Sequence, residues 1–249
     1  MTQTKSLRLT VAEKSQFLSR CYGWMAFALF LSAVVAYFTA ANLFTQTLDG
    51  HMQLSYLGKM LFAGRGMGFM LLCFLEIAVV IFLTAKIRTM SVFTARFSFI
   101  LYSVINGISL SSIFAVYQIA SIANAFLATS ATFVVMCIYG SKTKSDLTKL
   151  VRYCVMGLLG ILLATLLHFI LEFFTGAPLA MLDLLVSIAT VLVFTGLTAY
   201  DSQKILKTAE NSKNTDDYKK VAILGALELY LDFINILLAL LKLFGKRKD

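Results

Sequence analysis

Proline is almost absent from this chain, which has Pro178 as its single proline in 249 residues. Because proline interrupts helices, its scarcity leaves nearly the whole chain free to run as unbroken helix. Charged residues are also few, at 14% of the chain, whereas a soluble domain carries about 25%. The shortage of charge excludes an ordinary water-soluble fold.

Residues that bind metals or form cross-links are also scarce. The chain has only two histidines, His51 and His168, which argues against a histidine-based metal site. The four cysteines lie in or beside apolar runs, with no C-x-x-C pair among them: Cys21, Cys73, Cys137 and Cys154. They are predicted to be small packing residues. We therefore expect no resident cofactor and no enzymatic activity.

Hydrophobic residues make up 59% of the chain, and its mean hydropathy is +0.82. A spanning helix needs about 20 mostly apolar residues. Seven runs meet this requirement, at Tyr22–Phe44, Gly66–Ala85, Ser98–Tyr117, Ile122–Tyr139, Tyr153–Phe174, Leu179–Tyr200 and Val221–Phe244. The sequence therefore predicts an all-α integral membrane protein, with residues 1–249 forming a single domain of seven transmembrane helices.

Basic residues alternate along the chain in a way that predicts its orientation. The N-terminal segment and the loops at Lys86–Arg96, Ser141–Arg152 and Asp201–Lys220 together hold 16 of the 22 lysines and arginines. The opposite loops hold only Lys59 and Arg65. The positive-inside rule then places the N-terminal segment, residues 1–21, in the cytoplasm.

The basic C-terminal tail fits the positive-inside rule less well, because seven crossings place it outside the cytoplasm. Six crossings and a re-entrant last helix would keep it inside. We retain seven crossings. The formal charge of +9 comes from residues at the ends of apolar runs, so membrane lipid, and not nucleic acid, is the expected partner. Short loops suit a bacterial inner membrane.

The last apolar run contains acidic residues, which are costly within a membrane. Insertion of such a charge costs about 2.5–3.5 kcal/mol, so it favours a functional role. Asp232 lies about a dozen residues into this run. Glu228 and Asn235 share its helix face, because residues three and four apart are neighbours on a helix. This polar stripe is expected to face a protein interior or a water-filled cavity.

Asp201 closes the preceding run and is predicted to lie near Asp232. If that helix continues to about Glu210 and the turn centres near Asn214, the two aspartates are 13 and 18 residues from the turn. They then differ in depth by about 7–8 Å. Two carboxylates this close in a poorly solvated site do not both ionise readily, and sharing a proton is the physics of a proton sensor. The alternative is that Asp201 only caps a helix end.

The second apolar run supplies further candidates. Glu76 lies within it and is able to face the same interior. Arg88, at its cytoplasmic end, has a side chain long enough to pair with an inward-facing aspartate. The alternative for Lys86 and Arg88 is simple positive-inside anchoring.

Two segments of the chain resemble the transmembrane Bax inhibitor motif family. They are Ala199–Ile205, which reads A-Y-D-S-Q-K-I, and Leu229–Asn235, which reads L-Y-L-D-F-I-N. The resemblance extends over the whole chain, including the N-G-I-S-L string at Asn106–Leu110 and the acid Glu76. The L-Y-L-D-F-I-N string is its most specific part.

The resemblance implies six helices around a central last helix and a pH-sensitive calcium leak. The two-aspartate sensor of the family corresponds to Asp201 and Asp232, which also become possible calcium contacts. Its latch arginine corresponds to Arg88, with Lys86 as the alternative, and its inward glutamate corresponds to Glu76.

Other functions remain open at this stage. A non-conducting interaction protein, modulating a membrane protease or a stress or cell-death response, is the main alternative and requires a membrane-protein partner. An intramembrane aspartyl protease also uses two aspartates, but Asp232 is not in a Gly-x-Gly-Asp context. A retinal-binding pump needs a lysine deep in the last helix, whereas Lys242 lies at its end.

Overall fold

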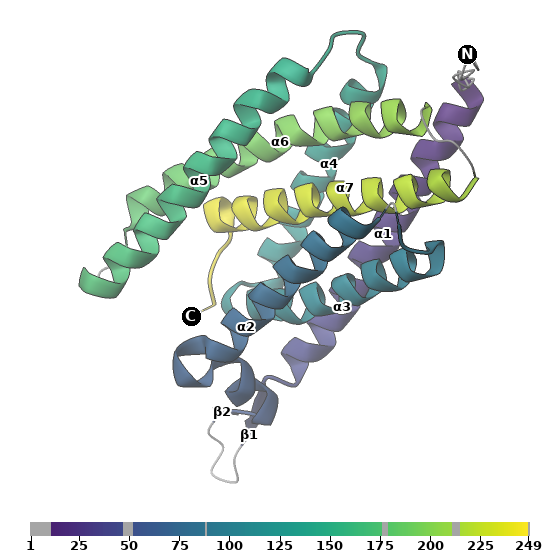
Figure 1. The fold of residues 1–249 in the computed structure, drawn as a ribbon. Helices are drawn as coiled ribbons and strands as arrows, with labels where there is room; N and C mark the ends of the chain where they lie inside the picture. Colours follow the sequence, from purple (N-terminus) through teal and green to yellow (C-terminus); the bar gives the residue numbers. More distant parts are fainter. Residues whose placement is uncertain (1–10, 47–51, 88, 176–178, 211–214, 249) are drawn as a thin grey trace. The chain divides into compact units, whose positions relative to one another are not determined.

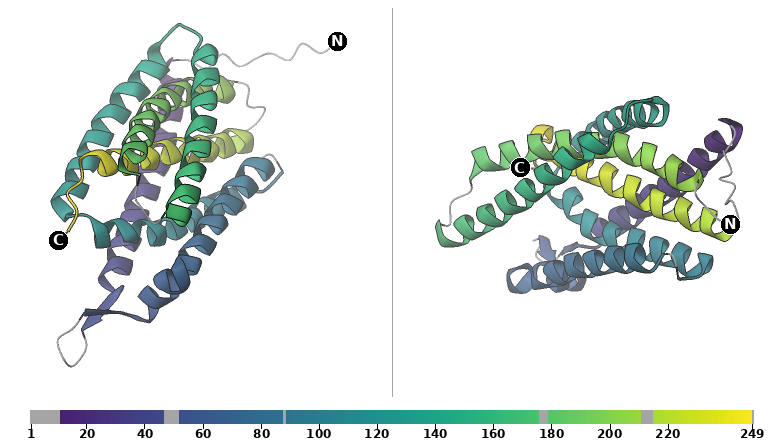
Figure 2. Two further views of the ribbon diagram at one scale, coloured as in Figure 1. Left: turned by 90° about the vertical axis from the view of Figure 1, so that its left-hand side faces the viewer. Right: turned by 45° about the horizontal axis from the view of Figure 1, so that its top comes forward.

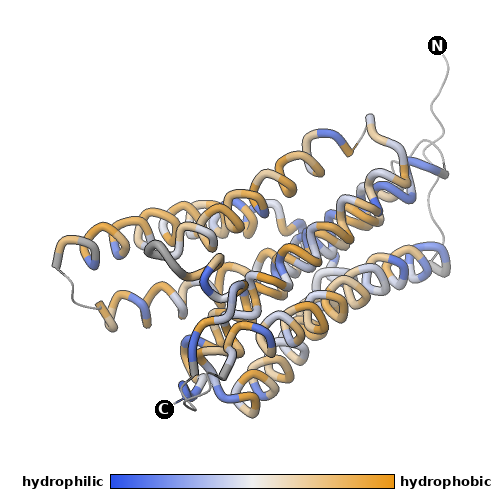
Figure 3. The backbone as a smooth tube through the Cα atoms, turned by 90° about the horizontal axis from the view of Figure 1, so that it is seen from below, coloured by the Kyte–Doolittle hydropathy of each residue, from blue (hydrophilic) through white to orange (hydrophobic). Residues whose placement is uncertain are grey.

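The computed structural model describes residues 11–46, 52–87, 89–175, 179–210 and 215–248. Within these ranges the chain folds into seven long helices (Figure 1), each long and apolar enough to cross a membrane. They are α1 (Val11–Ala41), α2 (Tyr56–Lys86), α3 (Val92–Val116), α4 (Ile119–Lys142), α5 (Thr148–Thr175), α6 (Ala180–Glu210) and α7 (Thr215–Phe244). The predicted all-α membrane fold is confirmed. Along the backbone in Figure 3, apolar residues line the helices and many hydrophilic residues lie toward their ends.

Helix α1 begins at Val11, eleven residues before the predicted start at Tyr22. The charged residues of this first part hid an apolar face from the sequence analysis. Phe17, Cys21 and Met25 recur at intervals of four and are 0%, 0% and 5% exposed. The extension is therefore an amphipathic continuation of the spanning helix.

The helix α6 continues to Glu210, as predicted, and α7 begins at Thr215. The turn predicted near Asn214 lies outside the described residues.

A two-stranded hairpin lies between α1 and α2. Strand β1 (Phe44–Gln46) pairs antiparallel with β2 (Met52–Leu54), so that Phe44 lies opposite Leu54. The first apolar run was expected to remain helical to Phe44, and this was wrong because the helix ends at Ala41. A strand pair depends on a partner several residues away, which an apolar run of this length does not reveal.

Helix α2 contains a turn at Gly66, which has φ +75°. The backbone there is left-handed, a conformation that residues with a Cβ adopt only with strain. The turn lets Gly68 pack directly on the backbone of Met60 and Leu61. The predicted spanning segment, which began at Gly66, is thus the part of α2 that follows this turn.

Gly66→Ala should therefore lower the free energy of unfolding by about 1 kcal/mol, the usual cost of the left-handed conformation. No neighbouring atom lies within 4 Å of a Cβ at this position, so backbone strain is the sole cause. Gly66→Asn should lose less, because asparagine tolerates this conformation. Thermal unfolding in detergent measures both changes, and equal losses for the two variants would contradict the account.

The chain divides into two compact units. One contains α4, α5, α6 and residues Glu228–Lys246, and the other contains Ser19–Tyr117 and Ser212–Leu227. In the first unit α6 packs against both α4 and α5 (Figure 2). In the second, α2 packs against α3. The first half of α7, to Leu227, belongs to the unit with α2 and α3, and its second half, from Glu228, belongs to the unit with α4, α5 and α6.

Small residues allow the helices of each unit to approach closely, as is common in membranes. A Cβ at Gly140 of α4 would collide with the carbonyl group of Ala199 in α6. In the other unit, a Cβ at Gly107 of α3 would lie 2.8 Å from the carbonyl oxygen of Ser32 in α1. The Ser32 hydroxyl also donates to the Ser103 carbonyl, at 2.7 Å.

Burial separates α7 from the other helices. Of the most apolar stretch of α7, 67% is buried, against 6% in α2 and in α5. Large apolar side chains such as Phe74 and Leu163 are more than 60% exposed on those two helices. The last helix is thus the most buried of the seven described, as expected for an interior helix.

Candidate functional site

Four ionisable side chains from α6 and α7 form one cluster within the first unit, called here the carboxylate cluster: Asp201, Lys204, Glu228 and Asp232. Helix geometry places them together, because Asp201 and Lys204 are three residues apart and Glu228 and Asp232 are four apart. The Lys204 Nζ atom lies 2.5 Å from Glu228 Oε1 and 3.9 Å from Asp201 Oδ1. The ammonium of Lys204 thus connects the two helices.

Asp232 is the most buried member of the cluster, with only 4% of its surface exposed. Its Oδ2 atom has no hydrogen-bond partner among the described residues. The Thr198 side chain lies against this carboxyl, while the Thr198 hydroxyl is 2.8 Å from the Phe194 carbonyl oxygen. When the hydroxyl donates to Phe194, its oxygen can only accept, so a bond to Asp232 then needs a protonated carboxyl.

The cluster has an excess of negative charge. Three carboxyls face one ammonium, and two negative charges are left unbalanced within the cluster when all four groups are ionised. The side chains of Asp201 and Glu228 are only 13% and 21% exposed. Because unbalanced charge is costly in a poorly solvated site, protons or a cation must neutralise it. The arrangement therefore favours protonation of its carboxyls.

The structure brings Asp201 and Asp232 into one cluster, as the hairpin geometry predicted, and adds Glu228 from the polar stripe. Asn235, also in that stripe, is half-buried and donates from Nδ2 to the Leu231 carbonyl of its own helix, at 2.8 Å. One of its two amide hydrogens is thus used within α7.

Glu76 lies in the other unit, against the Ser109 and Asn106 side chains of α3. Glu76 Oε1 and Ser109 Oγ are buried and lack a hydrogen-bond partner in the part of the chain that the structure describes. Two unpartnered oxygens make this a second buried polar position.

The predicted latch residues lie at the end of α2. Lys86 is exposed in the last helical turn, where its carbonyl accepts from the backbone amides of Thr89 and Met90, both at 3.0 Å. Arg88 lies outside the described residues. The pairing of either residue with Asp201 stays a prediction.

Lys204 is the member of the cluster that the sequence analysis missed, because it was counted with the basic loop residues. Counting residues from the turn between α6 and α7 would have placed Lys204 near Glu228. Lys204 and Glu228 are 10 and 14 residues from Asn214, which places them within about 6 Å in depth.

Gln203, beside the cluster, ties the α4–α5 loop to α6. Its Nε2 donates to the Ser145 carbonyl at 2.8 Å, and its Oε1 accepts from the Leu147 amide at 3.2 Å. The same loop carries Asp146, whose pKa is lowered by hydrogen bonds from the Thr148 side chain and then from Lys207. These hydrogen bonds therefore stabilise the folded protein above the ordinary pKa of the carboxyl. This stabilisation is lost as pH falls through the lowered pKa.

No group of three or more histidine, cysteine or acidic side chains among the described residues is arranged to hold a metal ion. The possible calcium contact at Asp201 and Asp232 stays a prediction.

Similar proteins are found in several bacteria. The inner membrane protein YbhL of Escherichia coli K12 is 38% identical over 234 residues, which cover 93% of this chain and 92% of YbhL. An uncharacterized protein of Borreliella burgdorferi is 38% identical over 237 residues, covering 95% and 94% of the two chains. A protein of Deinococcus radiodurans is 33% identical over 248 residues, with 99% and 96% covered.

The family described as "Inhibitor of apoptosis-promoting Bax1" matches residues 14–249, from α1 to the end of the chain. The match includes all seven helices and the whole carboxylate cluster. The protein therefore belongs to this family, Bax1-I, as a membrane protein with seven spanning helices.

Proposed function

We propose that this protein is a pH-sensitive calcium leak of the bacterial inner membrane, with Asp201 and Asp232 as its proton sensor. The observation that carries the proposal is the buried Asp232 carboxyl, with one oxygen unpartnered, in a cluster with excess negative charge. The inner membrane is the location in the name of the relative YbhL. The protein is expected to act without a resident cofactor and without catalysing a reaction.

Charge balance gives the mechanism. Carboxylate oxygens are the ligands that calcium prefers, and a divalent ion would balance the two excess charges of the cluster. Protons bound to the same carboxyls would remove those charges and so compete with calcium. In this mechanism Glu228 and Asn235 supply further polar contacts along the path of the ion, and the polar role of Glu76 stays a prediction.

A latch completes the proposal. Arg88, or Lys86 in its place, pairs with Asp201 in one state and releases it in another. Lys204 already lies 3.9 Å from Asp201, so a cation of the protein is beside this carboxylate in the structure. The closed state is then the one in which Asp201 is held by a cation of the protein.

The substitutions Asp201→Asn and Asp232→Asn test the sensor, because each removes a titrating group with little change in shape. The wild-type protein in liposomes, with a calcium-sensitive dye trapped inside, should give a flux that varies with pH. In each variant most of this variation should be lost. Asp216→Asn is the matched control. Asp216 is an exposed acid in α7, the helix of Asp232, and it lies outside the cluster. Variants that fold and keep the wild-type pH dependence would overturn the sensor.

The second candidate is a non-conducting protein that binds a membrane-protein partner and modulates a protease or a cell-death response. The description of the family, which refers to an inhibitor of Bax1, favours an interaction of this kind. This candidate predicts liposomes that remain tight to calcium at every pH, together with recovery of a partner by pull-down. The flux assay therefore separates the two functions.

A further inference from the structure

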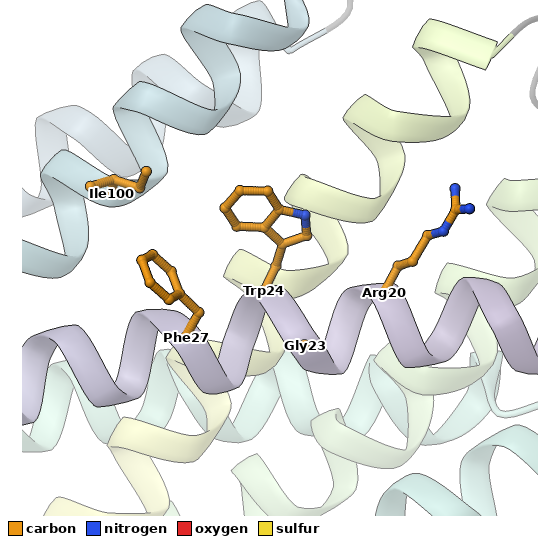
Figure 4. A pocket seen from close by; sticks show the side chains of 5 residues that line it. All are labelled: Arg20, Gly23, Trp24, Phe27 and Ile100. Carbon is orange, nitrogen blue, oxygen red and sulfur yellow. The ribbon is translucent and has the colours of Figure 1, made fainter.

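A pocket of about 410 Å³ opens between α1 and α3 within the second unit, far along the chain from the carboxylate cluster. Figure 4 shows Arg20, Trp24 and Phe27 rising from the same side of α1, with Ile100 on α3. The first three recur at i, i+4 and i+7, which places them on one helix face. Gly23 also lines the pocket, and its missing side chain leaves space between them.

One guanidinium group, that of Arg20, lines this pocket, and a second, that of Arg96, lies over the Trp24 ring of its wall. The Arg20 guanidinium is 5.9 Å from the centre of the Tyr218 ring, and that of Arg96 is 5.4 Å from the centre of the Trp24 ring. Cation–π contacts of this kind orient an arginine and leave its charge intact. No carboxylate in the described part of the chain forms an ion pair with either arginine. The mouth of the pocket is therefore positively charged.

The lining of the pocket changes from charged to apolar along the axis of α1. Arg20 ends the charged segment that precedes the apolar run, and Phe27 lies seven residues further into that run. Seven residues of helix correspond to about 10 Å of depth. Trp24 lies between them, where an indole is expected at the headgroup level of a bilayer. Phe27 is 48% exposed, so the apolar end of the pocket opens toward lipid.

We propose that this pocket binds one anionic phospholipid. Its phosphate lies between the Arg20 and Arg96 guanidiniums, and an acyl chain runs along Phe27 and Ile100. Guanidinium groups recognise phosphate oxygens in paired geometry, and basic pockets between membrane helices are suited to anionic headgroups. Charge and apolar surface about 10 Å apart match one amphipathic molecule, whereas free phosphate satisfies only the charged end.

Trp24 is the only tryptophan of the chain, so its fluorescence reports on this pocket alone. The full-length protein is placed in vesicles of phosphatidylcholine that contain a small fraction of lipid with brominated acyl chains, either phosphatidylglycerol or phosphatidylcholine. Bromine quenches tryptophan at short range. We expect brominated phosphatidylglycerol to quench Trp24 more strongly at equal fraction, with a relative affinity roughly fivefold higher for each arginine that faces the phosphate.

The variants Arg20→Gln and Arg96→Gln retain Trp24 and should each lose much of this preference. Arg152→Gln is the control, because Arg152 is an exposed arginine on α5, outside the pocket, and it should keep the preference. Inorganic phosphate added to the vesicles should leave the quenching unchanged. Equal quenching by the two brominated lipids in the wild type would overturn the proposal. A loss in Arg152→Gln as large as in Arg20→Gln, or displacement of the brominated lipid by inorganic phosphate, would also overturn it.

Discussion

Gly140→Ala should destabilise this protein by about 3 kcal/mol, at the upper end of the cost of overpacking. The three atoms nearest to a Cβ at this position are all backbone atoms of Ala199, which cannot move aside as the end of a flexible side chain can. The two helices must therefore separate. For a chain of this size the melting temperature should fall by about 10 °C.

Gly160→Ala is the matched control for this prediction. Gly160 is also a helical glycine, in α5, but nothing lies within 4 Å of a Cβ built there. Alanine should leave stability unchanged or raise it by about 0.5 kcal/mol, because it favours helix more than glycine does. Thermal unfolding of both variants in one detergent measures the difference, and equal melting temperatures would contradict the close contact between α4 and α6.

The position of Gly140 also connects this contact to the carboxylate cluster. Ala199 precedes Tyr200 and Asp201 in α6, so a shift of the helix at Ala199 would move Asp201. Wherever Gly140→Ala still folds, it should therefore change the pH dependence of calcium flux, whereas Gly160→Ala should not.

Lys204→Met should cause the second large loss, of about 2 kcal/mol in the free energy of unfolding. Methionine keeps a four-atom apolar chain like the stem of lysine but lacks the ammonium, which leaves Glu228 without its partner at 2.5 Å. Removal of one partner of a fully buried pair costs about 3–5 kcal/mol. The expected value is smaller because the Lys204 side chain is 39% exposed and partly screened by solvent.

A double-mutant cycle isolates this ion pair. Glu228→Gln removes the unpaired charge, so Lys204→Met combined with Glu228→Gln should be more stable than Lys204→Met alone. The loss in Lys204→Met should also shrink as pH falls, because protons then neutralise the carboxyls that Lys204 no longer balances. Equal stability of the single and double variants, with no effect of pH, would exclude a stabilising role of the pair.

The seven helices were predictable because a bilayer demands about 20 apolar residues for each crossing, and that requirement leaves a visible pattern in the sequence. The neighbourhood of Asp201 and Asp232 was predictable for a related reason. A tight hairpin between two long helices fixes which residues share a depth, so counting from the turn located the pair.

Other features depend on contacts that leave no local pattern. Gly140 and Gly160 look alike in the sequence, and only the approach of α6 distinguishes them. Lys204 resembled the other basic residues at the ends of apolar runs until Glu228 was placed beside it. The β1–β2 hairpin was missed because its pairing depends on residues from both sides of a loop.

Calcium flux through the purified wild-type protein in liposomes, measured from about pH 5 to about pH 8, tests the central claim most directly, since buried carboxyls titrate in this range. We predict flux above that of protein-free liposomes, with a rate that changes across the range and loses this dependence in Asp232→Asn. A flux equal to that of protein-free liposomes at every pH would contradict the claim that the carboxylate cluster gates an ion path.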